Sequence, residues 1–163
     1  MGNVSLRQYA PSVVVASVCI LFVVTGTDFA FTAETGFLNA MLYHFSHANI
    51  FHLAANLVAL FMFRPRWLTC AYGYLASSVA AVLPCAWVAG EATCGLSGFV
   101  FACWARRYWS FKIKPFYIFG ICLISAFIPH VNWRIHLYSF ILAFGIYAAR
   151  DCIKKKRYTQ HHS

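Results

Sequence analysis

Charged residues are scarce in this sequence of 163 residues. They make up only 10% of the chain, and 4 of them are Asp or Glu, whereas hydrophobic residues make up 61%. An ordinary soluble domain contains roughly 25% charged residues. This scarcity argues against such a domain and predicts an all-α membrane protein with most of its surface in lipid.

The sequence also lacks internal repeats, low-complexity segments and an HExxH motif. Without inverted repeats, nothing marks the chain as a transporter. Because the acidic residues lie outside the apolar runs, no buried carboxylate is available for acid–base chemistry. A zinc site is an alternative, since four histidines fall in or near the apolar runs, but we expect no metal and no cofactor. These histidines are His44, His47, His52 and His136.

The apolar runs predict six transmembrane helices in a single domain that covers residues 1–163. The expected spans are approximately 11–27, 45–63, 67–88, 95–108, 115–131 and 135–149, followed by a basic tail at 150–163. Several runs are shorter than the ~20 residues that a span requires, and by length they could also be core helices of a soluble protein.

The basic residues are distributed unevenly between the predicted loops. If the N-terminus is inside, 12 of the 13 Lys and Arg residues lie on the inner side and only Arg134 lies outside. This is the bias that the positive-inside rule describes. We therefore expect a multi-pass integral membrane protein with both termini cytoplasmic, in the bacterial inner membrane.

The net charge of +9 belongs to these loops and to the tail, which favours contact with anionic membrane lipid over binding of nucleic acid. Most of the 7 cysteines lie in apolar runs, where a thiol behaves as a small hydrophobic group. Cys85 and Cys94 flank one predicted outer loop, and a disulfide between them in an oxidising compartment is left open.

Polar residues gather at the start of the second apolar run. His52 and Asn56 are four residues apart, so on a helix they share one face. An imidazole and an amide placed together can donate hydrogen bonds to a developing oxyanion. The alternative is that they hold helices together, as polar side chains in bundles often do.

The fourth run begins with Gly95-Leu-Ser97-Gly98, which places a serine between glycines at the start of a helix. Glycine permits close backbone approach, and the free N–H groups of a helix start favour negative charge. Ser97 is therefore a candidate nucleophile with part of an oxyanion hole beside it. The alternative is that these are the small residues of ordinary helix packing.

The sixth run carries His136 near its start. A neutral imidazole can accept the proton of Ser97 and return it to a leaving amine. With no carboxylate in the runs, the pair would form a dyad. Ser139 and Ala143 follow on the same face and form a small-residue stripe, which we expect to pack closely against the helix that carries Ser97.

In this order, the motif of His47, His52 and Asn56, the GxSG motif and the last histidine resemble the rhomboid intramembrane serine proteases. The resemblance covers nearly the whole chain. It implies Ser97 as the nucleophile, His136 as the general base, and an oxyanion hole formed by His52, Asn56 and the Ser97 backbone N–H. It also implies that His47 supports the loop before the second helix.

Further residues bear on this resemblance. Phe101 matches an aromatic that packs on the catalytic imidazole. Two departures stand out: Ser139 and Ala143 replace glycines that are usual in the family, and the loop 28–43 lacks a Trp-Arg pair that many members have.

The resemblance implies an intramembrane serine endopeptidase that cleaves transmembrane segments of membrane proteins, with its active site opening to the outer side. The alternative is a catalytically inactive relative that binds membrane-protein clients.

Overall fold

The computed structural model describes residues 6–32, 34–84, 92–111, 120, 127 and 131–161. In these ranges the chain is mostly helical, and the backbones of Phe31 and Thr93 form an isolated antiparallel bridge. The helices, in chain order, are η1 (Leu6–Gln8), α1 (Ala10–Thr25), α2 (Phe37–Leu42), α3 (Ile50–Phe63), α4 (Trp67–Val82), α5 (Ser97–Phe111) and α7 (Trp133–His161).

Local signals set the ends of the first long helices. α1 stops at Gly26, which takes the left-handed conformation with φ 65° that glycine adopts without strain. α3 begins after Asn49, whose side chain accepts a hydrogen bond from the His52 backbone N–H at 2.9 Å. It ends at Arg64, also left-handed, and Pro65 follows.

The helix lengths overturn the prediction of membrane spans. α1, α3, α4 and α5 contain 14 to 16 residues, and at ~1.5 Å per residue they are about 21–24 Å long, short of the ~30 Å hydrocarbon core of a bilayer. α7 has 29 residues but carries Arg150, Asp151 and several lysines. Within the described ranges, no helix is both long enough and apolar enough to cross a membrane.

Two predictions are wrong on this finding. One is the six-transmembrane-helix rhomboid-like bundle with cytoplasmic termini, and the other is the location as a multi-pass protein of the bacterial inner membrane with its active site opening outward. The predicted spans are too long because the apolar runs include residues that are not helical. Residues 45–49 precede α3, and α4 ends six residues before the predicted boundary at 88. The predicted span 115–131 lies almost entirely outside the described residues.

The predicted basic tail differs as well, because α7 continues through it to His161. Lys and Arg are good helix formers, and neither glycine nor proline interrupts the sequence after Gly145. Arg106 on α5 also reaches this part of α7, and its guanidinium lies 3.6 Å from the carboxylate of Asp151.

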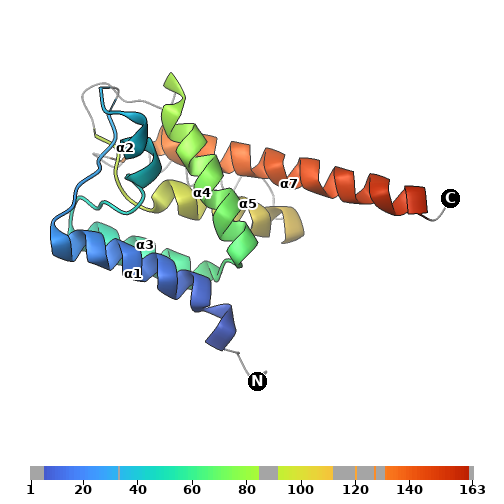
Figure 1. The fold of residues 1–163 in the computed structure, drawn as a ribbon, viewed down its shortest axis with the longest axis horizontal. Helices are drawn as coiled ribbons and strands as arrows, with labels where there is room; N and C mark the ends of the chain where they lie inside the picture. Colours follow the sequence, from blue (N-terminus) through green and yellow to red (C-terminus); the bar gives the residue numbers. More distant parts are fainter. Residues whose placement is uncertain are drawn as a thin grey trace.

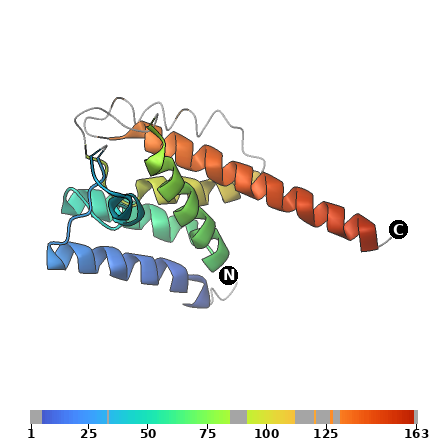
Figure 2. The same ribbon diagram turned by 45° about the horizontal axis from the view of Figure 1, so that its top comes forward.

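The helices pack in two connected groups. α1 and α3 lie side by side, while α4 packs against both α5 and α7, and the C-terminal half of α7 projects beyond the other helices (Figures 1 and 2). Buried side chains from α1, α3, α4 and α5 form one core, which includes Cys19, Leu60 and Phe99. Ser97, at the start of α5, thus lies where the two groups join.

Small residues form the second core, between α4, α5 and α7. Ala76, Ala102, Ala105 and Ala143 are almost completely buried and surround the ring of Tyr147. Side chains of this size let helix backbones approach closely. The close contact predicted for the stripe of Ser139 and Ala143 is present.

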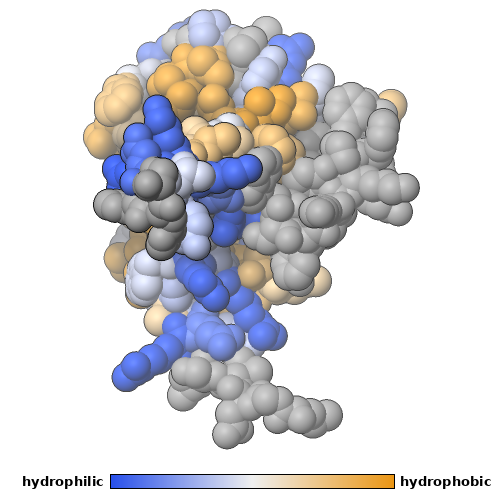
Figure 3. Space-filling view, turned by 90° about the vertical axis from the view of Figure 1, so that its right-hand side faces the viewer, coloured by the Kyte–Doolittle hydropathy of each residue, from blue (hydrophilic) through white to orange (hydrophobic). Residues whose placement is uncertain are grey.

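The outer faces of the helices expose many large apolar side chains. Val24 on α1 is 76% exposed, Phe51 on α3 is 83% exposed, and Met62 on α3 is 68% exposed. Figure 3, seen from the C-terminal end of α7, shows hydrophobic and hydrophilic residues gathered in separate areas.

We predict that Gly98→Ala destabilises the fold. A Cβ at this position would lie 2.8 Å from Ile135 Cγ2 and 3.1 Å from Ser139 Oγ, so α5 and α7 would have to separate. Overpacking of this kind costs about 1–3 kcal/mol, measurable as a lower free energy of unfolding in urea. Gly145→Ala on α7 is the matched control, since its Cβ would meet nothing within 4 Å. Equal stability of the two variants would contradict the predicted contact.

Candidate active site

Ser97 is the first residue of α5, and the segment before it is held in an unusual conformation. Gly95 has φ +103°, a value that residues with a side chain rarely adopt. Its backbone N–H donates to the Tyr43 carbonyl at 2.9 Å, and Phe31 and Thr93 exchange two backbone hydrogen bonds nearby. The serine is therefore presented at a helix start, where the first N–H groups have no partner within the helix.

His136 lies in the first turn of α7, and the start of this helix is tied to the segment before α5. The Asn132 side chain accepts a hydrogen bond from the Ile135 N–H at 3.3 Å and donates to Thr93 Oγ1 at 2.8 Å. One asparagine thus caps α7 and fixes it to the strand-like segment that leads to Ser97.

The two side chains meet across the contact of α5 and α7. Ser97 Oγ lies 2.7 Å from His136 Nε2, a short hydrogen bond. When the hydroxyl donates to Nε2, the imidazole proton is on Nδ1, which is the arrangement that a general base needs. The structure therefore brings together the two residues predicted to form the dyad.

The environment of His136 keeps its imidazole neutral. The side chain is buried, and the Phe101 ring stacks on it with centroids 4.5 Å apart and planes 4° from parallel, as predicted for this aromatic. Burial, with a smaller contribution from His52, lowers the pKa of His136 from 6.5 to about 4. At neutral pH the ring can accept a proton from Ser97.

His52 and Asn56 lie beside the same segment, as their spacing on α3 predicts. A Cβ on Gly95 would overlap the His52 ring, with Nε2 at 2.7 Å, and would lie 3.4 Å from Asn56 Nδ2. The Asn56 side chain is buried, and its Nδ2 has no hydrogen-bond partner among the residues that the structure describes. An unpaired buried donor costs about 1–3 kcal/mol, so its position beside Gly95, two residues before the candidate nucleophile, requires an explanation.

The other two histidines considered as zinc ligands have separate roles. His47 bonds the Phe45 carbonyl through Nδ1 at 3.1 Å and packs on His52 with ring centroids 5.3 Å apart, so it braces the start of α3. His44 instead faces α4, where its Nε2 lies 3.0 Å from Ser78 Oγ. In the part of the chain that the structure describes, no three metal-ligating side chains are grouped to hold one ion.

Several residues that shape the site were not singled out from the sequence. Tyr43, Thr93 and Asn132 act through backbone or capping hydrogen bonds between segments far apart in the chain. Gly95 was noted only as a flanking glycine, and its positive φ is the stronger reason for a glycine there. The suggested pairing of Cys85 with Cys94 stays a prediction, because Cys85 lies outside the described residues.

Comparison of the chain with protein-family models, with curated proteins and with solved structures finds no match. The assignment of a function therefore depends on the geometry of these side chains.

We predict that acid destabilises the fold. Burial lowers the pKa of His44 to about 3 and the pKa values of His47 and His136 to about 4, whereas histidine in the unfolded chain keeps a pKa near ~6.5. The unfolded state therefore binds more protons below that pH. The free energy of unfolding should be highest above it and fall toward pH ~4, by up to about 1.4 kcal/mol per pH unit for each histidine.

Urea denaturation at several pH values measures this slope. The slope gives the number of protons bound on unfolding. His136→Gln should lower this number by about one, since one fewer histidine is protonated on unfolding. The explanation fails if wild type and His136→Gln show the same pH dependence.

Proposed function

We propose that this chain is a serine endopeptidase that uses a Ser97–His136 dyad. The observation that carries the proposal is the 2.7 Å hydrogen bond between Ser97 Oγ and His136 Nε2. The neutral, buried imidazole and the position of the serine at a helix start support the same role. The resemblance of the motifs to those of the rhomboid proteases adds the expectation that the bond cleaved is a peptide bond.

In the proposed reaction, Ser97 Oγ attacks the carbonyl carbon of the substrate while His136 Nε2 takes the hydroxyl proton. The tetrahedral intermediate then collapses, the C–N bond breaks, and the imidazolium gives its proton to the leaving amine. Water, deprotonated by the same imidazole, hydrolyses the acyl-enzyme and restores Ser97. Phe101, stacked on the ring, holds the imidazole in the plane that both proton transfers need.

The oxyanion of the intermediate is proposed to bind His52, Asn56 and the Ser97 backbone N–H. The unpaired Asn56 Nδ2 supports this role, because a donor that gains its partner only when charge develops stabilises the transition state more than the ground state. Burial lowers the pKa of His52, so it offers the N–H of a neutral ring. The N–H groups at the start of α5 add the positive end of a helix.

The proposed substrate is a polypeptide with an apolar segment. Ile50 and Phe51, in the turn of α3 that also holds His52, are 61% and 83% exposed, so apolar surface lies beside the site. A hydrophobic segment can bind there while its peptide bond approaches Ser97.

We predict that Ser97→Ala and His136→Ala each lower the rate of peptide cleavage by about 10⁴-fold or more, and that the double variant is little worse than either. Non-additivity is expected because the two groups act in one step. Cleavage of a polypeptide with a hydrophobic segment and labelling by a fluorophosphonate are the two measurements.

Ser77→Ala is the matched control, because the Ser77 hydroxyl bonds the carbonyls of Gly73 and Tyr74 on its own helix. It should be labelled and should cleave as wild type does. Undiminished labelling of Ser97→Ala would refute the assignment of the nucleophile. A wild-type chain that binds hydrophobic polypeptides but is neither labelled nor active would support the client-binding alternative.

We further predict that Asn56→Ala lowers turnover by about 10²- to 10³-fold, the usual effect of removing one oxyanion donor. The free energy of unfolding should not fall, because the Nδ2 that the substitution removes has no partner within the described part of the chain. Val58→Ala, at a 61% exposed position on the same helix, controls for changes in α3. If Asn56→Ala loses stability but keeps turnover, the amide is a packing residue.

A further inference from the structure

Basic side chains gather at the end of the molecule that lies opposite the candidate site. This end is formed by η1, the end of α3, the start of α4 and the projecting half of α7 (Figures 1 and 2). The Arg64 guanidinium, after α3, lies 4.8 Å from the centroid of the Tyr9 ring, before α1. The Phe63 and Trp104 rings join α3 to α5 with centroids 4.9 Å apart, and the salt bridge of Arg106 ties α5 to α7.

The charge at this end is almost entirely positive. Its basic residues that the structure describes as exposed or half-buried are Arg7, Arg64, Arg66, Arg106, Arg150, Lys154, Lys155, Lys156 and Arg157. Among the described residues, Asp151 is the one acid here, and it pairs with Arg106. The other described acids, Asp28 and Glu34, lie in the loop between α1 and α2, which is bonded to the segment before Ser97. A field of one sign at this end attracts an anionic partner.

The projecting half of α7 carries positive charge on all sides. Successive residues of a helix are turned by about 100°, so the four basic residues at 154–157 point in four directions, and all four are exposed. A cluster of about four to eight Lys and Arg residues is typical of segments that bind anionic lipid headgroups.

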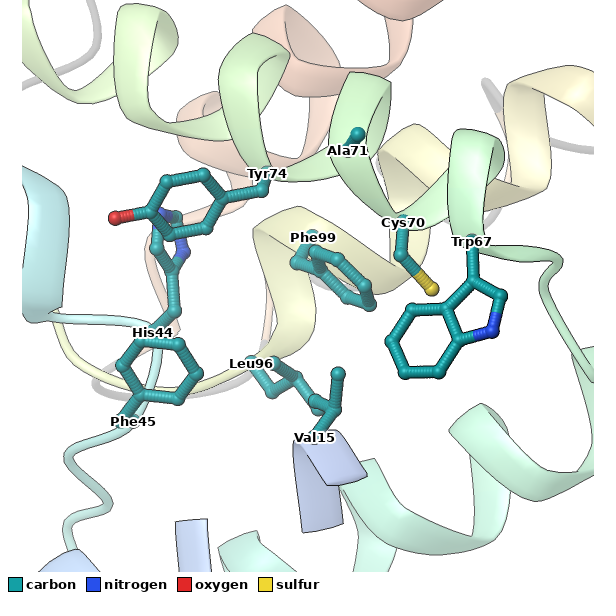
Figure 4. A pocket seen from close by; sticks show the side chains of 9 residues that line it. All are labelled: Val15, His44, Phe45, Trp67, Cys70, Ala71, Tyr74, Leu96 and Phe99. Carbon is teal, nitrogen blue, oxygen red and sulfur yellow. The ribbon is translucent and has the colours of Figure 1, made fainter. Parts of the chain in front are cut away.

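Exposed apolar side chains lie among these charges. Trp67 at the start of α4 is 57% exposed, and Ile153 and Tyr158, on either side of residues 154–157, are 54% and 68% exposed. Trp67 also forms one end of an apolar groove, with His44 at the other end (Figure 4). Figure 3 looks onto this end and shows hydrophilic residues bordered by hydrophobic ones. Nucleic acid would cover the charges and leave Ile153 in water, whereas the interfacial layer of a bilayer receives both kinds of side chain.

We propose that this basic end binds the surface of a bilayer that contains anionic phospholipid. The lysines and arginines contact the phosphate oxygens of the headgroups, and Trp67, Ile153 and Tyr158 enter the interfacial layer. At ~1.5 Å per residue, His136 lies roughly 28 Å from Lys155 along the axis of α7, so the dyad stays clear of the headgroups. Binding to lipid is therefore independent of the proposed cleavage and can be measured separately.

Flotation of the purified full chain with unilamellar vesicles tests the proposal. Vesicles of phosphatidylcholine alone are compared with vesicles in which about one-third of the lipid is phosphatidylglycerol. We expect at least about 10-fold tighter binding to the anionic vesicles, and weaker binding as salt screens the charges. Equal affinity for both vesicles would show adsorption through apolar surface alone and would overturn the proposal. So would displacement from the anionic vesicles by polyuridylate at an equal concentration of phosphate, which would show a preference for nucleic acid.

A matched pair of variants tests the location of the lipid contact. Arg157→Gln and Arg134→Gln each remove one exposed guanidinium, at opposite ends of α7. Arg157→Gln should weaken binding about five-fold, the effect of one basic residue near an anionic surface, and Arg134→Gln by less than about two-fold. Lys154→Gln, Lys155→Gln and Lys156→Gln together should weaken it about 100-fold. Circular dichroism verifies that each variant folds. Equal effects of the two arginine substitutions would show a response to net charge alone and would refute the site as proposed.

Discussion

The close approach of α5 and α7 at Gly98 is the contact on which the candidate site depends. Ile135 and Ser139 lie where a Cβ on Gly98 would be, and the buried alanines farther along α5 and α7 extend the same close packing. Ser97 and His136 lie next to these residues on their helices, so their 2.7 Å hydrogen bond follows from the backbone separation. A larger residue at this point would widen the gap between the hydroxyl and the imidazole.

Hydrogen bonds between loops fix the segment that leads to Ser97 and the start of the helix that carries His136. Gly95 bonds Tyr43, Thr93 bonds Phe31, and Asn132 joins Thr93 to the start of α7. These bonds hold the segment before Ser97 against α3, where His52 and Asn56 lie. The site is thus assembled from residues near the starts of three helices, and two of these starts, those of α3 and α7, are capped by asparagine side chains.

The site keeps polar groups in an apolar setting at a cost to stability. Burial of the histidines, which lowers their pKa values, and of the Asn56 Nδ2, which has no partner among the described residues, costs free energy that apolar side chains would not. His44 is buried in the same way, and burial lowers its pKa to about 3.

The sequence by itself determined which residues carry polar chemistry and which helix faces they share. The spacing of His52 and Asn56, the glycines around Ser97 and the stripe after His136 are local patterns, and helix geometry alone converts them into neighbours. The apolar composition predicted helices that are too long. An apolar run does not show where a helix ends, and Gly26 and Arg64 end α1 and α3.

Only the tertiary structure decided that Ser97 meets His136 and that Asn56 Nδ2 lacks a partner among the described residues. Each of these depends on contacts between segments far apart in the chain, and backbone packing sets those distances independently of any local pattern.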